Sequence, residues 1–371
     1  MSLSVKSLIE AYDPKTPLSH ASTPPSGWYT DSRIDALEAQ RVFASSWQLV
    51  ARVEQLENNG QFVSTDVAGE PILIVRDGEL RAFYNVCRHH AARVVAQGDG
   101  CVSALHCPYH GWTYNLDGTL RSAPHFAGVG DFDKRQHGLN AIRVDIWECW
   151  VFVCLDPDTP SLEVFLGSLF NRLVPLDVAS LKFHKRISYD FDCNWKVFVD
   201  NYLDGGYHVP HIHRGLTSAL DTLQYKIEID DRYCLQTCPI DSGKSDVRGG
   251  DLAFYCWLYP NTMINWYEGV MDVNLTVPLP GNRCRVHFDY YFADQDDAFK
   301  QQSIEMAHQV QLEDMAISES VQIGLQSRSY ETGRLSVTKE SGEHLFHRLL
   351  HYDLKKAMDQ QADRRQTLQP C

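Results

Sequence analysis

Two pairs of side chains that could bind a metal stand close together in the first third of the chain. Cys87 and His89 are separated by one residue. Cys107 and His110 begin 17 residues later and are separated by two. Zinc sites usually place two cysteines in one pair and two histidines in the other. Here each pair supplies one thiolate and one imidazole. This suits two irons, one bound by both thiolates and the other by both imidazoles, so the spacing favours an iron–sulfur cluster over structural zinc. Three neighbours fall outside this register and are expected to serve packing or the surface: His90, Cys101 and His106.

A second group of candidate ligands lies in NWKVFVDNYLDGGYHVPHIH, residues 194–213. Pro210 is poorly tolerated inside a helix, so helical periodicity cannot select two histidines with a common face. The residue types indicate a metal site, but the spacing leaves its ligand pair open. The candidates are His208, His211 and His213, preceded by Asp200 and Asp204.

Strand-like segments surround the first motif. QFVSTDVAG, EPILIVRDG and ELRAFYNVC are rich in β-branched and aromatic residues, and VDIWECWVFVCLD adds a further apolar strand. The pairs Asp77-Gly78 and Asp117-Gly118 are typical of hairpin turns. Residues 41–156 are therefore expected to form a small all-β domain.

The rest of the chain mixes both kinds of element. Residues 251–293 alternate as an antiparallel sheet does, and residues 296–327 have helical periodicity without glycine or proline until Gly324. We predict an α+β fold: an N-terminal arm (1–40), the all-β domain (41–156) and a catalytic domain (157–371) with an antiparallel sheet flanked by helices. Within the arm, the proline- and serine-rich residues 14–27 are expected to be extended.

Bulk properties limit the partners. At 371 residues the chain can hold two cores. Its net charge of −14 argues against nucleic acid or an anionic membrane surface as a partner. No apolar run is long enough to span a membrane, and the N-terminus lacks the apolar segment of a signal peptide. Together with eleven cysteines without disulfide-type spacing, these features predict a cytoplasmic protein.

The C-x-H-x17-C-x2-H pattern, with Gly111-Trp112 after the second pair, resembles the motif of a Rieske [2Fe–2S] centre. The resemblance implies four cluster ligands: Cys87, His89, Cys107 and His110.

NWK…DNY…YH-x4-H resembles the mononuclear iron motif of Rieske non-heme iron oxygenases. Such iron takes two histidines and one carboxylate and leaves positions open for dioxygen. The resemblance assigns the histidines to His208 and His213 and treats His211 as a neighbour. It places the carboxylate at Asp314, in the Glu-Asp pair before ESVQ-x-GL. Other acids in the same predicted helix are Glu313 and Glu319.

Within this family, DNYLDGGYHVPHIH and ESVQIGLQSRSYETGR are most similar to the choline monooxygenases of plants and their bacterial relatives. The likeness extends from about residue 28 to about residue 350. It implies attack on a carbon beside a quaternary or tertiary amine. Aromatic faces bind such cations, although aromatic residues on strands more often fill a core. The candidate cage residues are Tyr255, Trp257, Trp266 and Tyr267.

The resemblance also implies partners. The family assembles as homotrimers and receives electrons from NAD(P)H through a separate ferredoxin or flavin reductase. No G-x-G-x-x-G fingerprint occurs in this chain. One oxygen atom of O2 would enter the substrate and the other would leave as water.

Most family members place an acid three residues before the first iron histidine, where it links a cluster histidine of one subunit to an iron histidine of the next. Here that position is Gly205, and Asp204 stands one residue earlier, as in the plant choline enzymes. The flexibility of Gly205 and Gly206 can preserve the bridge. The alternative is that Asp204 only satisfies backbone donors at a helix end.

Two rival functions remain at this point. The substrate could be an aromatic acid or methoxyarene, giving ring hydroxylation or O-demethylation. In another class, the chain could be an electron carrier or a zinc-binding module without oxygenase activity. The second histidine motif argues against that class, because neither member needs a site of two histidines and a carboxylate.

Overall fold

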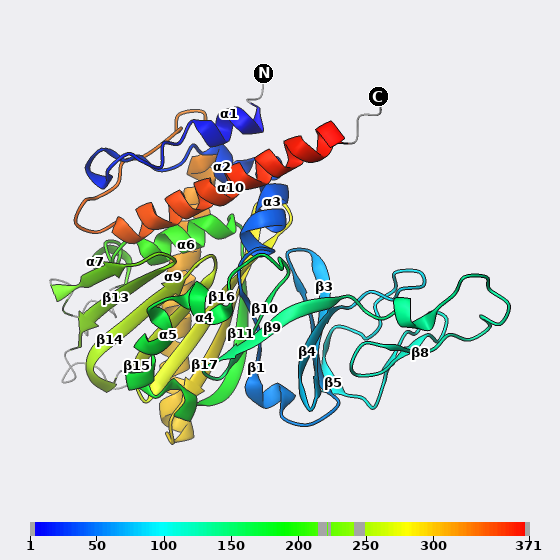
Figure 1. The fold of residues 1–371 in the computed structure, drawn as a ribbon. Coiled ribbons are helices and arrows are strands. Elements are labelled where there is room, and N and C mark those ends of the chain that lie inside the picture. The colour runs from blue at the N-terminus through cyan, green and yellow to red at the C-terminus, as the bar shows by residue number, and fades with distance from the viewer. Residues whose placement is uncertain (1–3, 214–220, 222–223, 241–248, 368–371) are drawn as a thin grey trace. The chain divides into compact units, whose positions relative to one another are not determined.

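The computed structural model describes residues 4–213, 221, 224–240 and 249–367 (Figure 1). The chain divides into two compact units, Ala39–Phe165 and a second unit formed by Met1–Glu38 with Leu166–Cys371. The predicted α+β class is confirmed: the first unit is built from antiparallel strands and the second combines an antiparallel sheet with helices. None of the helices in the described part of the chain is long and apolar enough to cross a membrane.

The unit Ala39–Phe165 contains a seven-stranded antiparallel sheet in the order β1-β10-β9-β4-β3-β2-β5 and a three-stranded sheet, β6-β7-β8. The strands are β1 (Gln48–Arg52), β2 (Gln61–Val67), β3 (Glu70–Asp77), β4 (Glu79–Tyr84), β5 (Gly98–Cys101), β6 (Leu105–His106), β7 (Thr113–Tyr114), β8 (Leu120–Ser122), β9 (Ala141–Trp147) and β10 (Trp150–Cys154). The expected hairpin at Asp77-Gly78 joins β3 to β4. One apolar core of this unit contains both cysteines of the first motif together with Trp112 and Tyr114.

The second unit contains another seven-stranded antiparallel sheet, in the order β11-β17-β16-β15-β14-β13-β12. The strands are β11 (Lys182–Phe191), β12 (Lys226–Ile229), β13 (Tyr233–Pro239), β14 (Gly249–Leu258), β15 (Thr262–Glu268), β16 (Val270–Leu279) and β17 (Arg283–Phe292). The predicted alternation over 251–293 thus corresponds to β14–β17. Because β11 pairs with β17, a strand from before the histidine motif closes one edge of this sheet.

Helices carry the second motif onto this sheet. The helices are α1 (Val5–Glu10), α2 (Gly27–Thr30), α3 (Ser32–Leu37), α4 (Leu162–Leu166), α5 (Leu169–Arg172), α6 (Trp195–Leu203), α7 (Val209–Ile212), α9 (Asp297–Leu325) and α10 (Ser341–Thr367). Helix α6 packs on β16 and β17, and α9 packs on α6 and β11. Asn194 caps α6, since its side chain accepts from the N–H of Lys196. The predicted helix over 296–327 is α9.

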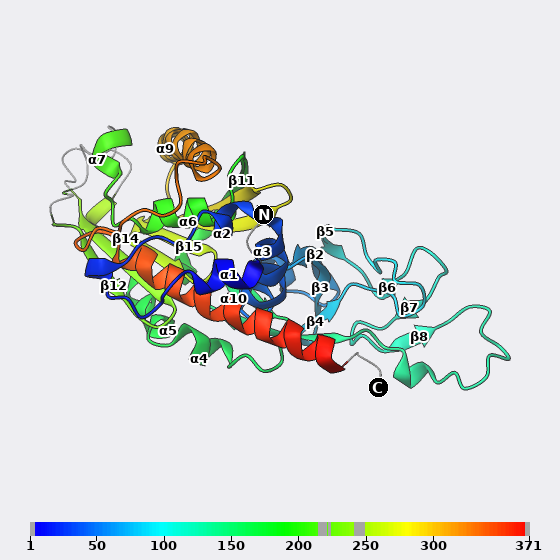
Figure 2. The ribbon, with the colours of Figure 1, turned by 90° about the horizontal axis from the view of Figure 1, so that it is seen from above.

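Residues 4–38 pack within the second unit. Residues 14–27 contain one short 3-10 turn, Leu18–His20, and otherwise no regular element before α2. Trp28 is fully buried and donates from Nε1 to the carbonyl of Leu8 at 2.9 Å. Figures 1 and 2 both place α1 alongside α10, which it contacts. This segment therefore stabilises the helices behind the second motif.

Candidate metal centres and the adjoining cavity

The first motif lies on two loops of the same design. Cys87 and His89 follow β4, and Cys107 and His110 lie between β6 and β7. In each loop the cysteine N–H donates to the carbonyl five residues later, at 2.8 Å in both cases. The residue four after each cysteine has a left-handed backbone, with φ of 61° at Ala91 and 73° at Gly111. The two loops are thus closed in the same way and hold their side chains in place.

The thiols point inward and the imidazoles outward. Cys87 and Cys107 are buried in the apolar core, whereas His89 is half-buried and His110 is exposed. The two imidazole rings lie 4.7 Å apart. His89 Nδ1 is buried and has no hydrogen-bond partner among the described residues, a costly state for a polar atom unless a metal occupies it. The four residues therefore fit a [2Fe–2S] cluster with two imidazole ligands on one iron.

His90, which was expected to serve packing or the surface, lies beside the two histidines of the first motif. Its ring nitrogen lies with those of His89 and His110, all within 4.8 Å of one another, although it falls outside the ligand pattern. Cys101 is exposed and His106 hydrogen-bonds Thr113, as expected for residues outside the site.

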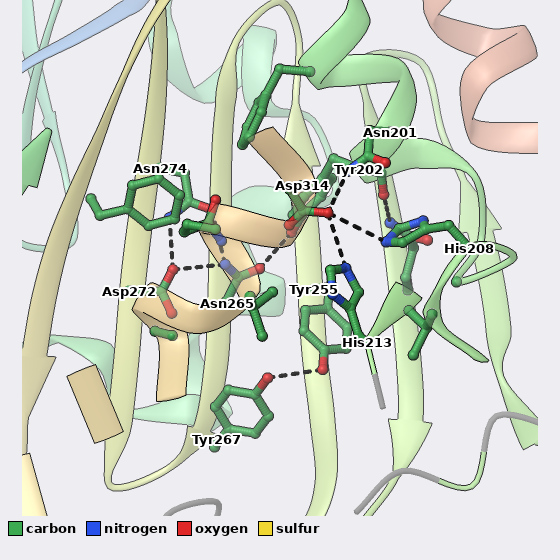
Figure 3. A pocket seen from close by; sticks show the side chains of 18 of the residues that line it. Asn201, Tyr202, His208, His213, Tyr255, Asn265, Tyr267, Asp272, Asn274 and Asp314 are labelled. Carbon is green, nitrogen blue, oxygen red and sulfur yellow. Dashed lines mark hydrogen bonds and ion pairs between the residues drawn. The ribbon is translucent and has the colours of Figure 1, made fainter. Parts of the chain in front are cut away.

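The second motif brings three side chains to one point. His208 lies just before the short helix α7 and His213 just after it. Their rings are 5.0 Å apart and nearly perpendicular. Asp314, in the middle of α9, approaches both: its Oδ1 is 3.0 Å from His213 Nε2 and 3.8 Å from His208 Nε2 (Figure 3). Two imidazoles and one carboxylate with open space beside them fit a mononuclear iron that activates dioxygen.

The other candidates lie elsewhere. His211 is exposed, and its ring is 6.4 Å from that of Tyr207. Glu319 accepts a hydrogen bond from the backbone N–H of Asp192 at 3.1 Å. Asp200 accepts from Tyr29 Oη at 2.7 Å and lies 3.0 Å from His347 Nε2, in a separate buried network.

Two further carboxylates orient the histidines. Asp204 Oδ2 lies 2.6 Å from His208 Nδ1, and Glu313 Oε2 lies 2.7 Å from His213 Nδ1. With each Nδ1 held by an acid, each Nε2 faces Asp314. Such carboxylate–histidine pairs fix the ring orientation and tautomer of metal ligands. Asp204 also accepts from the backbone N–H of His208, so it satisfies a backbone donor and contacts the imidazole of the same residue.

The electrostatics of the site favour a cation. Burial lowers the pKa of His213, but hydrogen bonds and charge interactions with Asp314 and Glu313 outweigh burial and leave this pKa raised. Asp314 is buried and also accepts from Asn201 Nδ2 at 2.9 Å. The negative charge gathered here is what a divalent metal would compensate.

A cavity of about 150 Å³ opens beside this site. A cavity of this size holds one small organic molecule. Five tyrosines line it: Tyr202, Tyr225, Tyr255, Tyr267 and Tyr290. The Tyr255 and Tyr267 hydroxyls are 2.8 Å apart and their rings are perpendicular (87°), so two aromatic planes of different orientation face the space.

The structure separates the four cage candidates. Tyr255 and Tyr267 line the cavity, whereas Trp257 and Trp266 do not. Trp266 lies between the cavity residues Asn265 and Tyr267 on β15, so the alternation of the strand turns it to the other face of the sheet. Trp257 is fully buried, donates to the carbonyl of Pro260 and packs against Phe346 of α10. We therefore correct the prediction and exclude both tryptophans from the cage.

Several cavity residues were missed at the sequence level. Asn265, Asp272 and Asn274 are polar residues on otherwise apolar strands, and Asp272 accepts from both amides at 2.7 Å. The signal for Asp272 and Asn274 was the polar side chain at alternate positions of β16, which marks one strand face as lining a polar space. Glu313 was considered only as a rival ligand, because no spacing rule reveals an acid that supports another residue.

Comparison with known proteins agrees with this arrangement. Residues 46–133 match the family described as the Rieske [2Fe-2S] domain, and residues 178–355 match the ring hydroxylating alpha subunit (catalytic domain). Choline monooxygenase, chloroplastic, of Arabidopsis thaliana is 40% identical over 95% of this chain and 87% of its own length. The carnitine monooxygenase oxygenase subunit of Escherichia coli (strain K12) is 34% identical over 89% of this chain and 93% of its own.

Solved structures are similar over nearly the whole chain. The quaternary ammonium Rieske monooxygenase CntA in complex with L-carnitine has a TM-score of 0.79 at 29% identity, covering 96% of this chain and 99% of its own. A naphthalene 1,2-dioxygenase from Rhodococcus sp. has a TM-score of 0.75 at 19% identity, covering 90% of this chain and 94% of its own. The latter likeness concerns the fold alone.

A cluster domain joined to a catalytic domain with two histidines and a carboxylate defines the oxygenase component of an iron-dependent oxidoreductase. The chain belongs to the Rieske non-heme iron monooxygenases, whose cofactors are a [2Fe–2S] cluster and a mononuclear iron. Residues 178–355 match a catalytic domain, and this rules out the hypothesis that the chain is only an electron carrier or a zinc-binding module.

Proposed function

We propose that this chain hydroxylates a small quaternary amine such as choline. The observation that carries the proposal is the tyrosine-lined cavity, with a carboxylate in its wall, that opens on the site formed by His208, His213 and Asp314. Aromatic faces and carboxylates together recognise quaternary ammonium groups. The names of the relatives, choline monooxygenase and carnitine monooxygenase, support the same substrate class.

The reaction converts a C–H bond of the substrate to C–OH. One atom of O2 enters this bond, and the other leaves as water with two electrons and two protons. When bound, the cluster supplies single electrons and the iron supplies dioxygen activation. We assign the cluster to Cys87, His89, Cys107 and His110, and the iron to His208, His213 and Asp314.

The remaining residues position these groups. Asp204 and Glu313 hold the two imidazoles in the tautomer that directs Nε2 toward Asp314. The tyrosine walls hold the substrate and exclude water from the reacting carbon. By aligning the substrate with the metal ligands, these residues make the protein's own contribution to the reaction rate.

Partners follow from the chemistry. We propose that a ferredoxin, a flavin reductase or both bring electrons from NAD(P)H, and that the chain acts as a homotrimer. In that assembly Asp204 would link His208 of one subunit to His110 of the next. We also propose a cytoplasmic location, which the free thiol state of the described cysteines supports. We propose no nucleic-acid or membrane partner.

A substrate panel tests the proposed function. The purified oxygenase, with a surrogate reductase and NADH, is given choline, glycine betaine, carnitine, an aromatic acid and a methoxyarene, and products are identified by mass spectrometry. We expect conversion of a quaternary amine and none of the aromatic compounds. Conversion of an aromatic compound alone would favour ring hydroxylation or O-demethylation instead. The carboxylate in the cavity wall disfavours that outcome for aromatic acids.

A further inference from the structure

One amide of the cavity wall has an oxygen without a hydrogen-bond partner. Gln311 lies on α9, lines the cavity and is 9% exposed. Its Oε1 is buried and accepts no hydrogen bond from any described residue. A buried acceptor without a donor costs free energy. A ligand that fills the cavity can supply the donor.

The other amides of the wall are paired within the protein. Among the described lining residues, each of them makes at least one side-chain hydrogen bond: Asn201, Gln236, Asn265 and Asn274. Figure 3 shows the contacts that Asn265 and Asn274 make with Asp272. Gln311 differs from these four, because its oxygen is left to accept a hydrogen bond from a ligand.

Gln311 stands one helical turn before Asp314, the proposed iron ligand on the same helix. Residues three apart on a helix lie on one face, and both of these side chains line the cavity. The other described lining residues of α9 are Ser303, Ala307 and Val310. A group that binds to Gln311 is therefore held beside the iron site.

The chemistry of the proposed substrate class decides which group this is. A quaternary ammonium has four N–C bonds and no N–H, so it cannot donate to Gln311. In a quaternary amino alcohol the hydroxyl is the only hydrogen-bond donor. The ammonium end is bound by aromatic faces, which Tyr255 and Tyr267 supply from β14 and β15. The hydroxyl end then lies against α9.

We infer that Gln311 binds the hydroxyl group of the substrate and thereby selects the carbon that bears this group for hydroxylation. This inference rests on the proposed function and deepens it, because it names the position of attack and the residue that determines it.

Two positions of attack on choline give different products. At the carbon that bears the hydroxyl, C–H becomes C–OH, and the resulting gem-diol loses water to give betaine aldehyde. At an N-methyl carbon, C–H becomes C–OH, and the C–N bond then breaks with its electron pair going to nitrogen. The new hydroxyl loses its proton, and the products are formaldehyde and 2-(dimethylamino)ethanol. Either attack uses one O2, two electrons and two protons, and the second oxygen atom leaves as water.

Binding to the oxidised holoprotein tests the contact without turnover. The ligands are choline and propyltrimethylammonium, in which a methyl group replaces the hydroxyl, and calorimetry compares wild type with Gln311→Met. Wild type should bind choline ~10-fold more tightly, because propyltrimethylammonium forms no hydrogen bond and leaves the buried acceptor unpaired. Gln311→Met keeps the length of the side chain and removes the amide, so it should bind both ligands about equally.

Product analysis tests the position of attack. With a surrogate reductase and choline, wild type should form mainly betaine aldehyde. In Gln311→Met the ratio of formaldehyde to betaine aldehyde should rise ~10-fold, because the hydrogen bond that holds the hydroxyl end beside the iron site is lost.

Gln301→Met is the matched control. Gln301 is an exposed glutamine of the same helix that donates to Glu305 and does not line the cavity. This variant should therefore keep the binding preference and the product ratio of wild type. Iron content and cluster absorbance check that each variant is folded.

The outcomes separate the two proposals. If wild type neither binds nor converts a quaternary amine, the proposed function fails. If wild type converts choline but binds it no more tightly than propyltrimethylammonium, or forms mainly formaldehyde, the role of Gln311 is overturned while the proposed function stands. It is likewise overturned if Gln311→Met keeps the product ratio of wild type. If Gln311→Met does not fold, Gln311→Glu retains an acceptor at this position and should keep the preference for choline, and loss of that preference in the folded variant overturns the inference.

Discussion

At the iron site, Asp204 and Glu313 decide where the nitrogens of two histidines point. His208 and His213 could each present either ring nitrogen, and short contacts to the acids at Nδ1 leave Nε2 for the proposed metal. Resemblance to a family motif named His208, His213 and Asp314, and the structure brings these three side chains together. The sequence could not predict Glu313, because the contact joins residues 100 positions apart and depends on how α9 lies beside α7.

Glu313→Gln should lower the affinity for mononuclear iron by ~10–100-fold, as loss of a carboxylate behind a metal-bound histidine usually does. The cluster spectrum should not change. Iron content after dialysis against a graded chelator measures the effect. Glu319→Gln is the matched control, since Glu319 is on the same helix and contacts the backbone of Asp192. Asp314→Ala should lose the iron altogether. Equal iron retention in the two glutamine variants would contradict the role given to Glu313.

Asp204→Asn should leave both metals bound and slow electron transfer from the reduced cluster to the iron. The amide can still accept from the N–H of His208, but it loses the negative charge that orients the imidazole and would link the subunits. Stopped-flow absorbance of cluster reoxidation, with substrate and O2 present, measures the rate. A wild-type rate would assign the bridge to another acid, with Asp200 the first to be tried.

Among the elements, the sequence predicted those with strong periodicity. The alternation over 251–293 and the long run over 296–327 correspond to β14–β17 and α9. It could not predict which face each strand buries. For that reason Trp266 is among the cage candidates, although the neighbouring residues Asn265 and Tyr267 line the cavity and Trp266 does not. The pairing of β11 with β17 is also beyond sequence patterns, because it joins segments about 100 residues apart.

A buried ion pair joins the N-terminal segment to helix α6. Lys196 Nζ lies 2.5 Å from Glu38 Oε1, and Trp195 Nε1 donates to Glu38 Oε2 at 2.8 Å. Glu38→Gln should therefore destabilise the protein by about 3–5 kcal/mol, because it removes the carboxylate that pairs directly with the buried ammonium of Lys196. Denaturant unfolding followed by tryptophan fluorescence measures this loss.

The surface pair of Asp190 and Arg285 provides the comparison for that prediction. Both side chains are nearly half exposed, so Asp190→Asn should cost less than about 1 kcal/mol. The double variant with Glu38→Gln and Lys196→Met should recover part of the lost stability, since it removes both charges. Similar losses from Glu38→Gln and Asp190→Asn would contradict the account of the buried pair.

At the scale of the whole molecule, we expect two kinds of metal centre in one chain. The purified protein should contain about three irons and two acid-labile sulfides per chain and give the EPR signal of a reduced Rieske cluster. Stoichiometric zinc in a colourless protein would contradict the assignment of the first motif.

A single turnover tests the central claim most directly. Protein reduced at both centres, freed of excess reductant and mixed with O2 and choline, holds the two electrons that one hydroxylation needs. The account predicts about one oxidised choline per mononuclear iron, formed as the cluster reoxidises, and none with Asp314→Ala. Complete reoxidation of the cluster with all of the choline recovered unchanged would contradict it.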